Sequence, residues 1–366
     1  MTTLDDVSPK SRIAEPGEGI SLDELRLAAR NHGMPLEVLD LDVTPPGLHY
    51  LLTHYDIPLL DAAGWRLTVD GHVENVLELD LATLTSEPAT TQRVTFECAG
   101  NGRAKLDPRP VSQPWLDEAV GTAAWTGVPL AAVLRRAGVR PGAVDVVFTG
   151  ADHGVERGVE QDYQRALPLE DATADGVMLV HTMNGAPLPP QHGAPLRLVV
   201  PGWYGMTQVK WLTRITVLDE PFTGYQNATA YRVTREPDDP GEPVRRIQPK
   251  ALLRPPGFPD FQTRTRIVDA GTHELTGRAW SGEAPVARVE VSVDAGDTWH
   301  QAALDPAGDP YEWRRWRWRW VTQGTGLTEV WVRAADEAGN EQPVAEQWNR
   351  QAMANNHVQL TRVLVR

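Results

Sequence analysis

The sequence predicts a mixed α+β domain followed by a smaller β-sandwich. At about 150 residues per domain, 366 residues make two domains. Residues 42–235 mix strand-like and helix-like segments without the regular alternation of a doubly wound sheet. A proline-rich stretch at 236–262 is followed by short strand-like runs bounded by turns. We therefore expect an N-terminal extension over 1–41, a first domain over 42–250 and a second over 251–366.

The extension is predicted to carry one short amphipathic helix. Ser21 and Glu24 have the spacing of a capping box at its start. Gly33 and Pro35 are expected to end it. Its predicted apolar face consists of Leu22, Leu25 and Ala29.

The first domain contains three predicted strands and one clear helix. Alternation over 65–69 predicts a strand that ends at the Asp-Gly pair after it. A helix is expected over 130–137, closed by a glycine. The valine-rich runs 144–148 and 196–200 are typical of buried strands.

The second domain is predicted to be a sandwich of short strands. Residues 286–293 and 331–335 have strand character, with turns at 294–296 and 338–340. The run 316–320 alternates tryptophan with arginine, which resembles a nucleic-acid box. Period-two alternation instead predicts tryptophans on one face of a strand and arginines on the other.

Composition limits the function classes. The chain is 41% hydrophobic and 23% charged, ordinary for a globular protein, and its net charge is −14. That charge argues against a general nucleic-acid binder, which needs a basic face. No apolar stretch has the length of a membrane helix, and the N-terminus has no long apolar run or twin arginine. We expect a cytoplasmic protein, or a periplasmic or secreted one if a signal has been removed.

Cys98 is the only cysteine in the chain. A lone thiol forms no internal disulfide, and it cannot build a zinc or iron–sulfur cage that needs several thiolates. Three readings remain: an inert buried thiol, a nucleophile, or a single soft ligand to a metal held mostly by something else. A strand-like run, 94–96, ends just before it, and a Gly-Asn-Gly turn with Arg103 follows. This setting predicts a lowered thiol pKa.

The run from Cys98 to Arg103 reads Cys-Ala-Gly-Asn-Gly-Arg. It resembles the Cys-Ala-Gly-Asn-x-Arg loop of the sulfite oxidase family, whose thiolate binds molybdenum on a pterin dithiolene. The resemblance extends from about residue 42 to the C-terminus. It implies a first domain that binds molybdenum–molybdopterin and an immunoglobulin-like second domain used for homodimerisation.

The resemblance also implies a set of cofactor contacts. His192, Arg197 and Lys210 match positions that hold the pterin phosphate, which suits paired cations. Asp152 matches a position that contacts the pterin ring, where a carboxylate accepts N–H bonds. The complete set is Tyr50, His54, Asp152, His192, Arg197, Gln208 and Lys210.

Four residues match catalytic positions of the family. Cys98 would be the metal ligand, and Arg103 would place positive charge beside the metal. Trp115 matches an aromatic wall of the substrate pocket. Tyr231 is similar to the family's active-site tyrosine, although the residues around it depart from the family pattern.

Two departures concern the substrate. Animal and plant members carry an arginine that binds the substrate oxyanion in a segment where this chain has Leu52. Near the C-terminus, a second family arginine falls on Gln351. A pocket without these charges would bind a small dianion poorly, since a hydrogen bond to a charged group contributes about 1.5–3 kcal/mol.

Three functions follow as hypotheses. The first is oxygen-atom transfer of the sulfite oxidase type, from sulfite to sulfate, with electrons leaving to a separate acceptor protein. The second is the same cofactor run as a reductase of an S-oxide or related oxide, with a separate donor protein. The third is a non-enzymatic binding protein without metal. One cysteine cannot form a Cys-x-x-Cys-His haem attachment, so no haem is expected.

Overall fold

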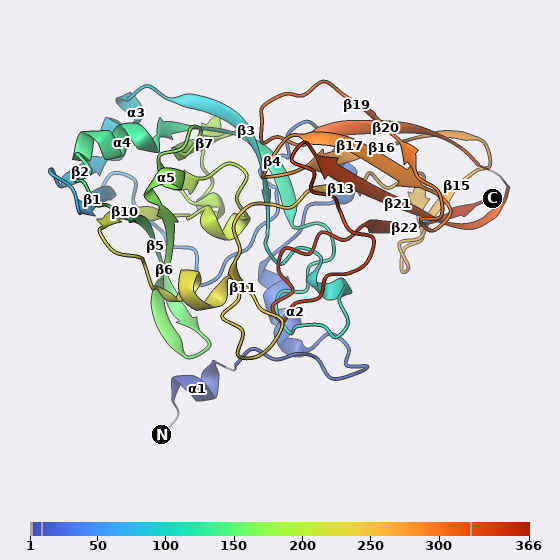
Figure 1. Ribbon diagram of the computed structural model, residues 1–366, viewed down its shortest axis with the longest axis horizontal. Coiled ribbons are helices and arrows are strands. Elements are labelled where there is room, and N and C mark those ends of the chain that lie inside the picture. Colours follow the sequence, from blue (N-terminus) through green and yellow to red (C-terminus); the bar gives the residue numbers. More distant parts are fainter. Residues whose placement is uncertain (1–2, 9, 323) are drawn as a thin grey trace.

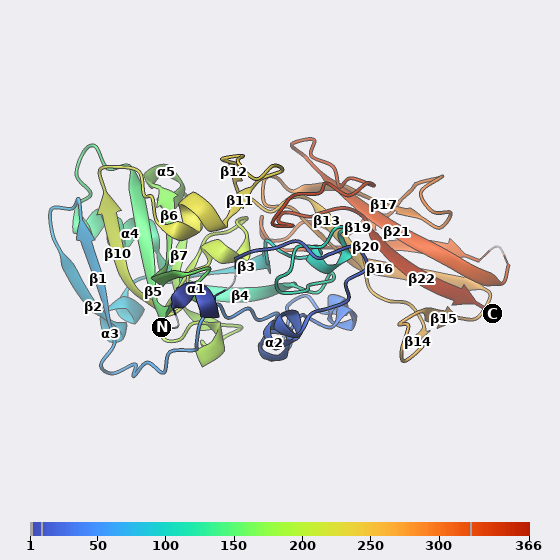
Figure 2. The same cartoon turned by 90° about the horizontal axis from the view of Figure 1, so that it is seen from below.

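The computed structural model describes residues 3–8, 10–322 and 324–366. Residues 1, 2 and 9 of the predicted extension and residue 323 of the predicted second domain lie outside that description. The chain forms two lobes, with strands β1–β10 in one and β13–β22 in the other (Figure 1). Figure 2 shows the same two lobes from below, with β3 and β4 between them. Both lobes are mostly β, with few helices.

Two sheets build the first lobe. One has the order β2-β1-β10-β5-β6, with β1 and β10 parallel and the other neighbours antiparallel. Its strands are β1 Arg66–Gly71, β2 Leu77–Asp80, β5 Asp145–Glu156, β6 Val159–Pro168 and β10 Leu212–Leu218. The other has the order β3-β4-β7-β8, with β9 also paired to β7. Its strands are β3 Thr90–Glu97, β4 Val120–Pro129, β7 Met178–Met183, β8 Ala186–Pro187 and β9 Arg197–Val199.

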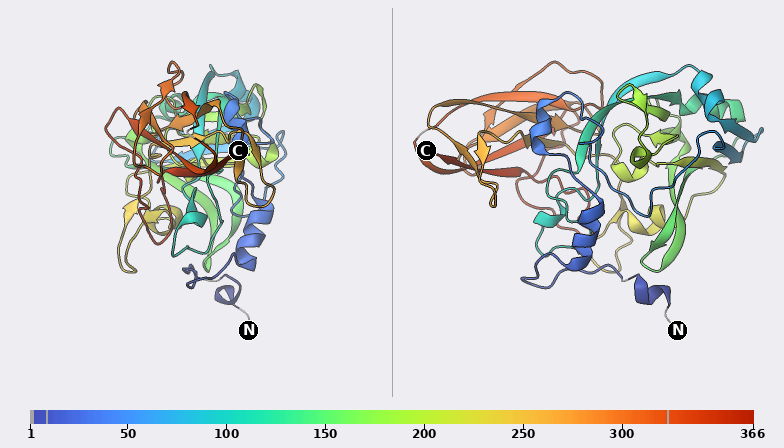
Figure 3. Two further views of the ribbon diagram at one scale, coloured as in Figure 1. Left: turned by 90° about the vertical axis from the view of Figure 1, so that its right-hand side faces the viewer. Right: turned by 180° about the vertical axis from the view of Figure 1, so that it is seen from behind.

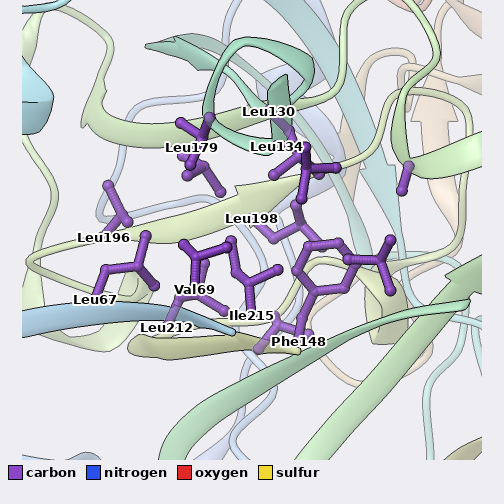
Figure 4. Packing of buried hydrophobic residues seen from close by; sticks show 14 of the residues in the cluster. Leu67, Val69, Leu130, Leu134, Phe148, Leu179, Leu196, Leu198, Leu212 and Ile215 are labelled. Atoms are coloured by element: carbon purple, nitrogen blue, oxygen red, sulfur yellow. The ribbon is translucent and has the colours of Figure 1, made fainter. Parts of the chain in front are cut away.

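The core of this lobe lies between the two sheets. Apolar side chains from β1, β5 and β10 face those from β7, β9 and the helix α4 (Figure 4). The helix α4, Leu130–Ala137, is where the sequence predicts it, closed by Gly138 at φ +69°. The strand predicted at 144–148 is longer, because β5 continues into a hairpin with β6.

The remaining helical elements are short. They are α1 Leu4–Val7, α2 Leu22–Arg30, η1 Leu36–Asp40, α3 Leu81–Ser86, η2 Arg103–Lys105, α5 Leu169–Ala172, η3 Pro190–His192, η4 Gly205–Thr207 and the π-helical η5 Gln226–Ala230. In the described ranges no helix combines the length and apolarity that a membrane span requires.

The capping box of α2 is confirmed, but its predicted apolar face is wrong. The Ser21 hydroxyl accepts a hydrogen bond from the N–H of Glu24, and the Glu24 carboxylate accepts one from the N–H of Ser21. The side chain that turns inward is Glu24, which is fully buried and paired with Arg109 at 2.9 Å. Leu22 is 62% exposed, because the ion pair fixes the polar face of the helix against the protein.

The second lobe consists of two sheets that share one apolar core. The first sheet has the order β13-β16-β20-β19: Lys250–Leu253, Thr272–Trp280, Arg314–Val321 and Ala303–Leu304. The second has the order β14-β15-β22-β21-β17-β18: Phe258–Pro259, Arg266–Val268, Gln359–Val365, Gly326–Asp336, Val286–Ser292 and His300–Gln301. The C-terminus lies at the far end of this lobe (Figure 3).

Two expectations for this part of the chain have different outcomes. The alternation at 316–320 is confirmed, since Trp316 and Trp320 are buried while Arg317 and Arg319 are exposed. The proline-rich stretch 236–262 is not purely a linker. It contains β12 Glu242–Pro243, which pairs with β11 Arg232–Val233, as well as β14 and the fully buried β13. The partner of β13 is β16, a distant pairing that local composition does not reveal.

Candidate functional site

The Cys98 loop begins where β3 ends. The N–H of Cys98 donates to the carbonyl of Ala119 at 2.9 Å, and the carbonyl of Cys98 accepts from the N–H of Asn101 at 2.9 Å. The Asn101 side chain accepts from the N–H of Ala119 and donates to the Glu97 carboxylate. Gly102 follows with φ +88°, which allows the turn into η2.

A cavity opens in front of this loop, and it gathers most of the predicted site. The predicted residues on its wall are Tyr50, His54, Cys98, Asp152, His192, Arg197, Gln208, Lys210 and Tyr231. They come from segments as distant as residues 50 and 231. Other lining residues are His49, Leu51, Leu52, Phe96, Ala99, Tyr163, Gly205 and Met206.

Arg103 and Trp115 do not line this cavity. Both are buried. Each shifts the pKa of the Cys98 thiol downward, although the net shift is upward because of burial. The Arg103 guanidinium donates to the carbonyl of Gln351 at 3.1 Å. They therefore act on the thiol itself, whereas we expected them to form walls of the substrate pocket.

The pKa of Cys98 is raised, which corrects the expectation of a lowered value. Burial is the largest cause, because it disfavours the thiolate. The positive charge of Arg103, the N–H of Gly100 and Trp115 act in the opposite direction and do not overcome it. A bound metal ion would favour the thiolate, because its charge opposes the effect of burial.

Two basic side chains, Arg197 and Lys210, line the same cavity as the thiol. Arg197 donates to the carbonyls of His192 (2.8 Å) and Gln208 (3.1 Å), and its guanidinium lies over the rings of Phe96 and Trp125. Its pKa falls to about 10 through burial. The Arg197 guanidinium thus contacts carbonyl oxygens and aromatic rings. Because these partners do not neutralise its charge, the guanidinium can still bind an anion.

Lys210 is a second basic group on the cavity wall, and its side chain is half-buried. Its ammonium donates to the carbonyl of Leu52 at 2.9 Å and lies over the Trp211 ring. Burial and Arg197 lower the pKa of Lys210 to about 7, against the opposing charge of Asp152. Burial also lowers the pKa of His192 to about 2, so that imidazole is neutral and acts as a hydrogen-bonding group.

Asp152 and Gln208 differ in how their polar atoms are used. Asp152 Oδ1 is buried and lacks a hydrogen-bond partner among the described residues, and burial raises the Asp152 pKa to about 6. The Gln208 amide is already engaged: it accepts from the N–H of Val200 at 2.7 Å and donates to the carbonyls of Val200 and Trp203. Gln208 thus shapes the wall, whereas Asp152 has an acceptor available for a bound N–H group.

Tyr231 and His54 form a hydrogen-bonded pair on the wall. The Tyr231 hydroxyl lies 2.8 Å from His54 Nε2. Burial raises the pKa of Tyr231 and lowers that of His54, so the phenol keeps its proton and the imidazole is neutral. Arg165, which sequence reasoning missed, places its guanidinium 5.5 Å from the centre of the Tyr231 ring. The sequence could have indicated Arg165 as a charged residue beside the apolar run at the end of β6.

The two departures from the family pattern are visible in the structure. Leu52 lines the cavity with an apolar side chain. The Gln351 amide is bonded to Thr234 at 2.8 and 3.1 Å, and only its carbonyl reaches toward the site, through Arg103. Neither position supplies a positive group to the cavity.

His49 also lines the cavity, and it was not identified from the sequence. It stacks on Tyr50, and its buried Nε2 lacks a partner in the described chain.

These donors fit a molybdenum–pterin group. Arg197, Lys210 and His192 suit a phosphate, because their cations and N–H groups meet carbonyls but no carboxylate salt bridge. The partnerless Asp152 Oδ1 suits the N–H groups of a heterocycle. Cys98 supplies one soft sulfur ligand, as molybdenum accepts.

Comparison with known proteins gives the class. Residues 54–226 match the oxidoreductase molybdopterin-binding domain, and residues 259–365 match the Mo-co oxidoreductase dimerisation domain. The chain therefore contains both domains characteristic of molybdopterin oxidoreductases. It belongs to the sulfite oxidase family of molybdenum enzymes.

Relatives within this family differ in activity. The chain is 31% identical over 343 residues to nitrate reductase [NADH] 1 of Arabidopsis thaliana, covering 86% of this chain and 37% of that protein. It is 32% identical over 345 residues to nitrate reductase [NADH] 1 of Oryza sativa subsp. japonica, with the same coverage. The chain thus spans just over a third of these relatives. The sulfane dehydrogenase SoxCD of Paracoccus pantotrophus matches 96% of this chain and 87% of its own, at 27% identity and a TM-score of 0.79.

Proposed function

We propose that this protein transfers an oxygen atom at a sulfur-centred small substrate, in the sulfite oxidase manner, and passes electrons to a separate acceptor protein. One observation carries the proposal: a single cavity brings the Cys98 sulfur together with the basic side chains of Arg197 and Lys210. The SoxCD likeness over nearly the whole chain supports a sulfur substrate. The likeness to nitrate reductases covers only the corresponding part of longer proteins.

The residues divide the work as follows. When bound, a molybdenum pterin would supply oxygen-transfer and two-electron chemistry, with water as the source of the oxygen atom. Cys98 would be its protein ligand, and Arg197, Lys210, His192 and Asp152 would hold its organic part. Tyr231 keeps a proton on its hydroxyl, hydrogen-bonded to neutral His54, so that this proton is available at the cavity wall.

A reductase of an S-oxide is the second candidate, and Leu52 favours it. A neutral leucine on the wall lowers the positive charge offered to a dianion but accommodates the carbon groups of an S-oxide. The two candidates share every cofactor contact. They differ in substrate charge and in the direction of electron flow.

Metal analysis and a substrate panel test the proposal. Protein from a host that makes the pterin cofactor should contain molybdenum, and sulfite turnover with an artificial acceptor should exceed S-oxide or nitrate turnover by about tenfold or more, a barrier difference of about 1.4 kcal/mol. Faster S-oxide reduction with a reduced donor would favour the second candidate. Turnover of nitrate alone would reject both, and protein without molybdenum would point to a non-enzymatic binding protein.

The proposal includes a homodimer through the second lobe, which we assign to the immunoglobulin-like class of sandwich. Support comes from the matched dimerisation domain and from an apolar row across the outer face of the second sheet. Cross-strand neighbours Phe258, Ile267, Leu364 and Leu327 form this row. Phe258 and Leu327 are 49% and 63% exposed. A two-fold axis would place the row against its own copy.

Charge on this row should separate the protomers. In Leu327→Glu/Leu364→Glu, the two-fold axis repeats each added carboxylate on the partner protomer. Like charges would then face one another in an interface that excludes water. Sedimentation equilibrium should then give the mass of one chain, 40.4 kDa, where the wild type gives twice that. Val321→Glu, at a 51% exposed position on the other sheet, is the control and should remain dimeric. A dimeric double variant would refute this interface.

A further inference from the structure

Glu97, the residue before Cys98, is a buried carboxylate whose partners come from the second lobe. It is 2% exposed. Its Oε1 lies 3.2 Å from the ammonium of Lys250 on β13, and its Oε2 accepts from the indole N–H of Trp280 on β16 at 2.9 Å. Lys250 is 1% exposed and Trp280 is 2% exposed. The Cys98 loop is therefore anchored at its start by the neighbouring lobe.

The far end of the loop is held by a segment before β22. The N–H of Ala354 donates to the carbonyl of Ala99 at 2.8 Å, and the Asn355 amide donates to the carbonyl of Gly102 at 3.1 Å. Lys250 links the two sets of contacts, because its ammonium binds Glu97 and also donates to the carbonyl of Asn355 at 3.2 Å. One buried cation thus ties together both groups that hold the loop.

The backbone of that segment adopts costly conformations. Ala352 and Ala354 have φ of +48° and +53°, in the left-handed region that residues with a Cβ avoid. Ala352 is fully buried. Such conformations persist where the surroundings over-determine them, and they cluster at functional sites.

Contacts within the first lobe hold the loop mainly through Cys98 and Asn101. Gly100 and Gly102 carry no side chain, and glycine is the residue with the most conformational freedom to lose. A Cβ at Gly100 would lie 2.6 Å from Arg103 Nη2, so the guanidinium occupies the space where a side chain would pack. The bonds from the second lobe to Glu97, Ala99 and Gly102 add restraints at both sides of the Cys98 sulfur.

We propose that Glu97, Lys250, Trp280 and Asn355 form a clamp through which the second lobe positions the Cys98 sulfur. These are positioning residues, since they act through the loop. The consequence for the metal rests on the proposed function, whereas the effect on the loop concerns the protein chain alone. A buried ion pair is weak evidence for stability, because shape-matched uncharged residues often serve as well. The clamp therefore predicts a loss of loop order in a variant that remains folded.

Hydrogen exchange of the cofactor-free protein tests the clamp directly. Glu97→Gln/Lys250→Met removes both charges and keeps similar shapes, so neither partner is left as an uncompensated ion. Amides of residues 99–103 should exchange at least about tenfold faster than in the wild type, as expected when charged hydrogen bonds that hold a local unit are lost. Glu24→Gln/Arg109→Met, which removes the ion pair between α2 and Arg109 away from the Cys98 loop, is the control and should leave these amides unchanged.

Spectroscopy of the loaded protein tests the consequence for the metal. The double variant should retain molybdenum but show an altered electron paramagnetic resonance signal, and its turnover should fall by about tenfold to a hundredfold, the range seen when residues that orient a metal ligand are changed. The Glu24/Arg109 control should match the wild type in both. If no protein form binds molybdenum, the proposed function fails while the exchange experiment still decides the clamp.

Loop exchange equal to that of the wild type in the double variant would overturn the clamp. If that variant does not fold, Trp280→Phe takes its place, since it removes one N–H donor to Glu97 and keeps an aromatic ring. It should accelerate exchange at 99–103 by a smaller factor. Unchanged exchange in a folded Trp280→Phe protein, with an unchanged spectrum, would also refute the proposal.

Discussion

Cys98→Ser should reduce turnover by about a thousandfold or more, equivalent to about 4 kcal/mol of lost transition-state stabilisation. Serine offers a hard oxygen that stays protonated, whereas molybdenum favours soft sulfur donors. The side chains are of similar size, and Cys98 is buried, so the fold should persist. Steady-state kinetics, metal content and the visible spectrum of the loaded protein measure the effect.

Two comparisons make this result interpretable. Thermal unfolding of the cofactor-free variant should follow that of the wild type within a few degrees, since the change is nearly isosteric. Released pterin should be measured beside the metal, so that loss of the ligand is distinguished from loss of the whole cofactor. A Cys98→Ser protein with the wild-type spectrum and undiminished turnover would remove the thiolate from the mechanism.

Lys210→Met should lower the occupancy of the site by the cofactor. The ammonium faces the cavity without a carboxylate salt bridge, and a charged hydrogen bond to a phosphate contributes about 1.5–3 kcal/mol, or roughly tenfold to a hundredfold in affinity. Molybdenum and pterin per chain should therefore fall together. Arg214→Met, which breaks an exposed ion pair with Asp70, is the control and should retain full occupancy. Full occupancy in Lys210→Met would contradict the phosphate assignment.

The same substitution should change how the stability of the cofactor-free protein depends on pH. The pKa of Lys210 is about 7 in the folded protein and 10.5 ordinarily. Between these values the unfolded chain binds a proton that the folded one lacks, so the wild type gains stability as pH rises. Lys210→Met lacks this gain. Asp152, with its pKa raised to about 6, acts at lower pH, where its contribution falls as pH rises.

Local patterns predicted the elements that local interactions stabilise. The helix α4 was found at its observed bounds because its apolar spacing and closing glycine are contiguous in sequence. The tryptophan–arginine alternation of β20 likewise reports directly on two faces. By contrast, β13 was read as linker, since its only support is pairing with β16 and burial beneath a distant sheet.

The pKa shifts of the site residues could not be predicted from local sequence patterns. Sequence alone placed Arg103 beside Cys98 and suggested a lowered thiol pKa, but burial outweighs that charge. Burial depends on every segment packed around the loop, including residues more than two hundred positions away. For the same reason α2 exposes Leu22 and buries Glu24, because Arg109 arrives from another part of the chain.

The sequence by itself determined the family, and it predicted the metal-binding thiol and the groups expected around a pterin, because these are carried by residue type and order. Only the tertiary structure decided which of these residues line one cavity and which do not. It also decided that the second lobe contacts the start of the Cys98 loop through the Glu97–Lys250 ion pair. The physical reason is that desolvation and hydrogen bonding act between residues near in space, and only folding sets that proximity.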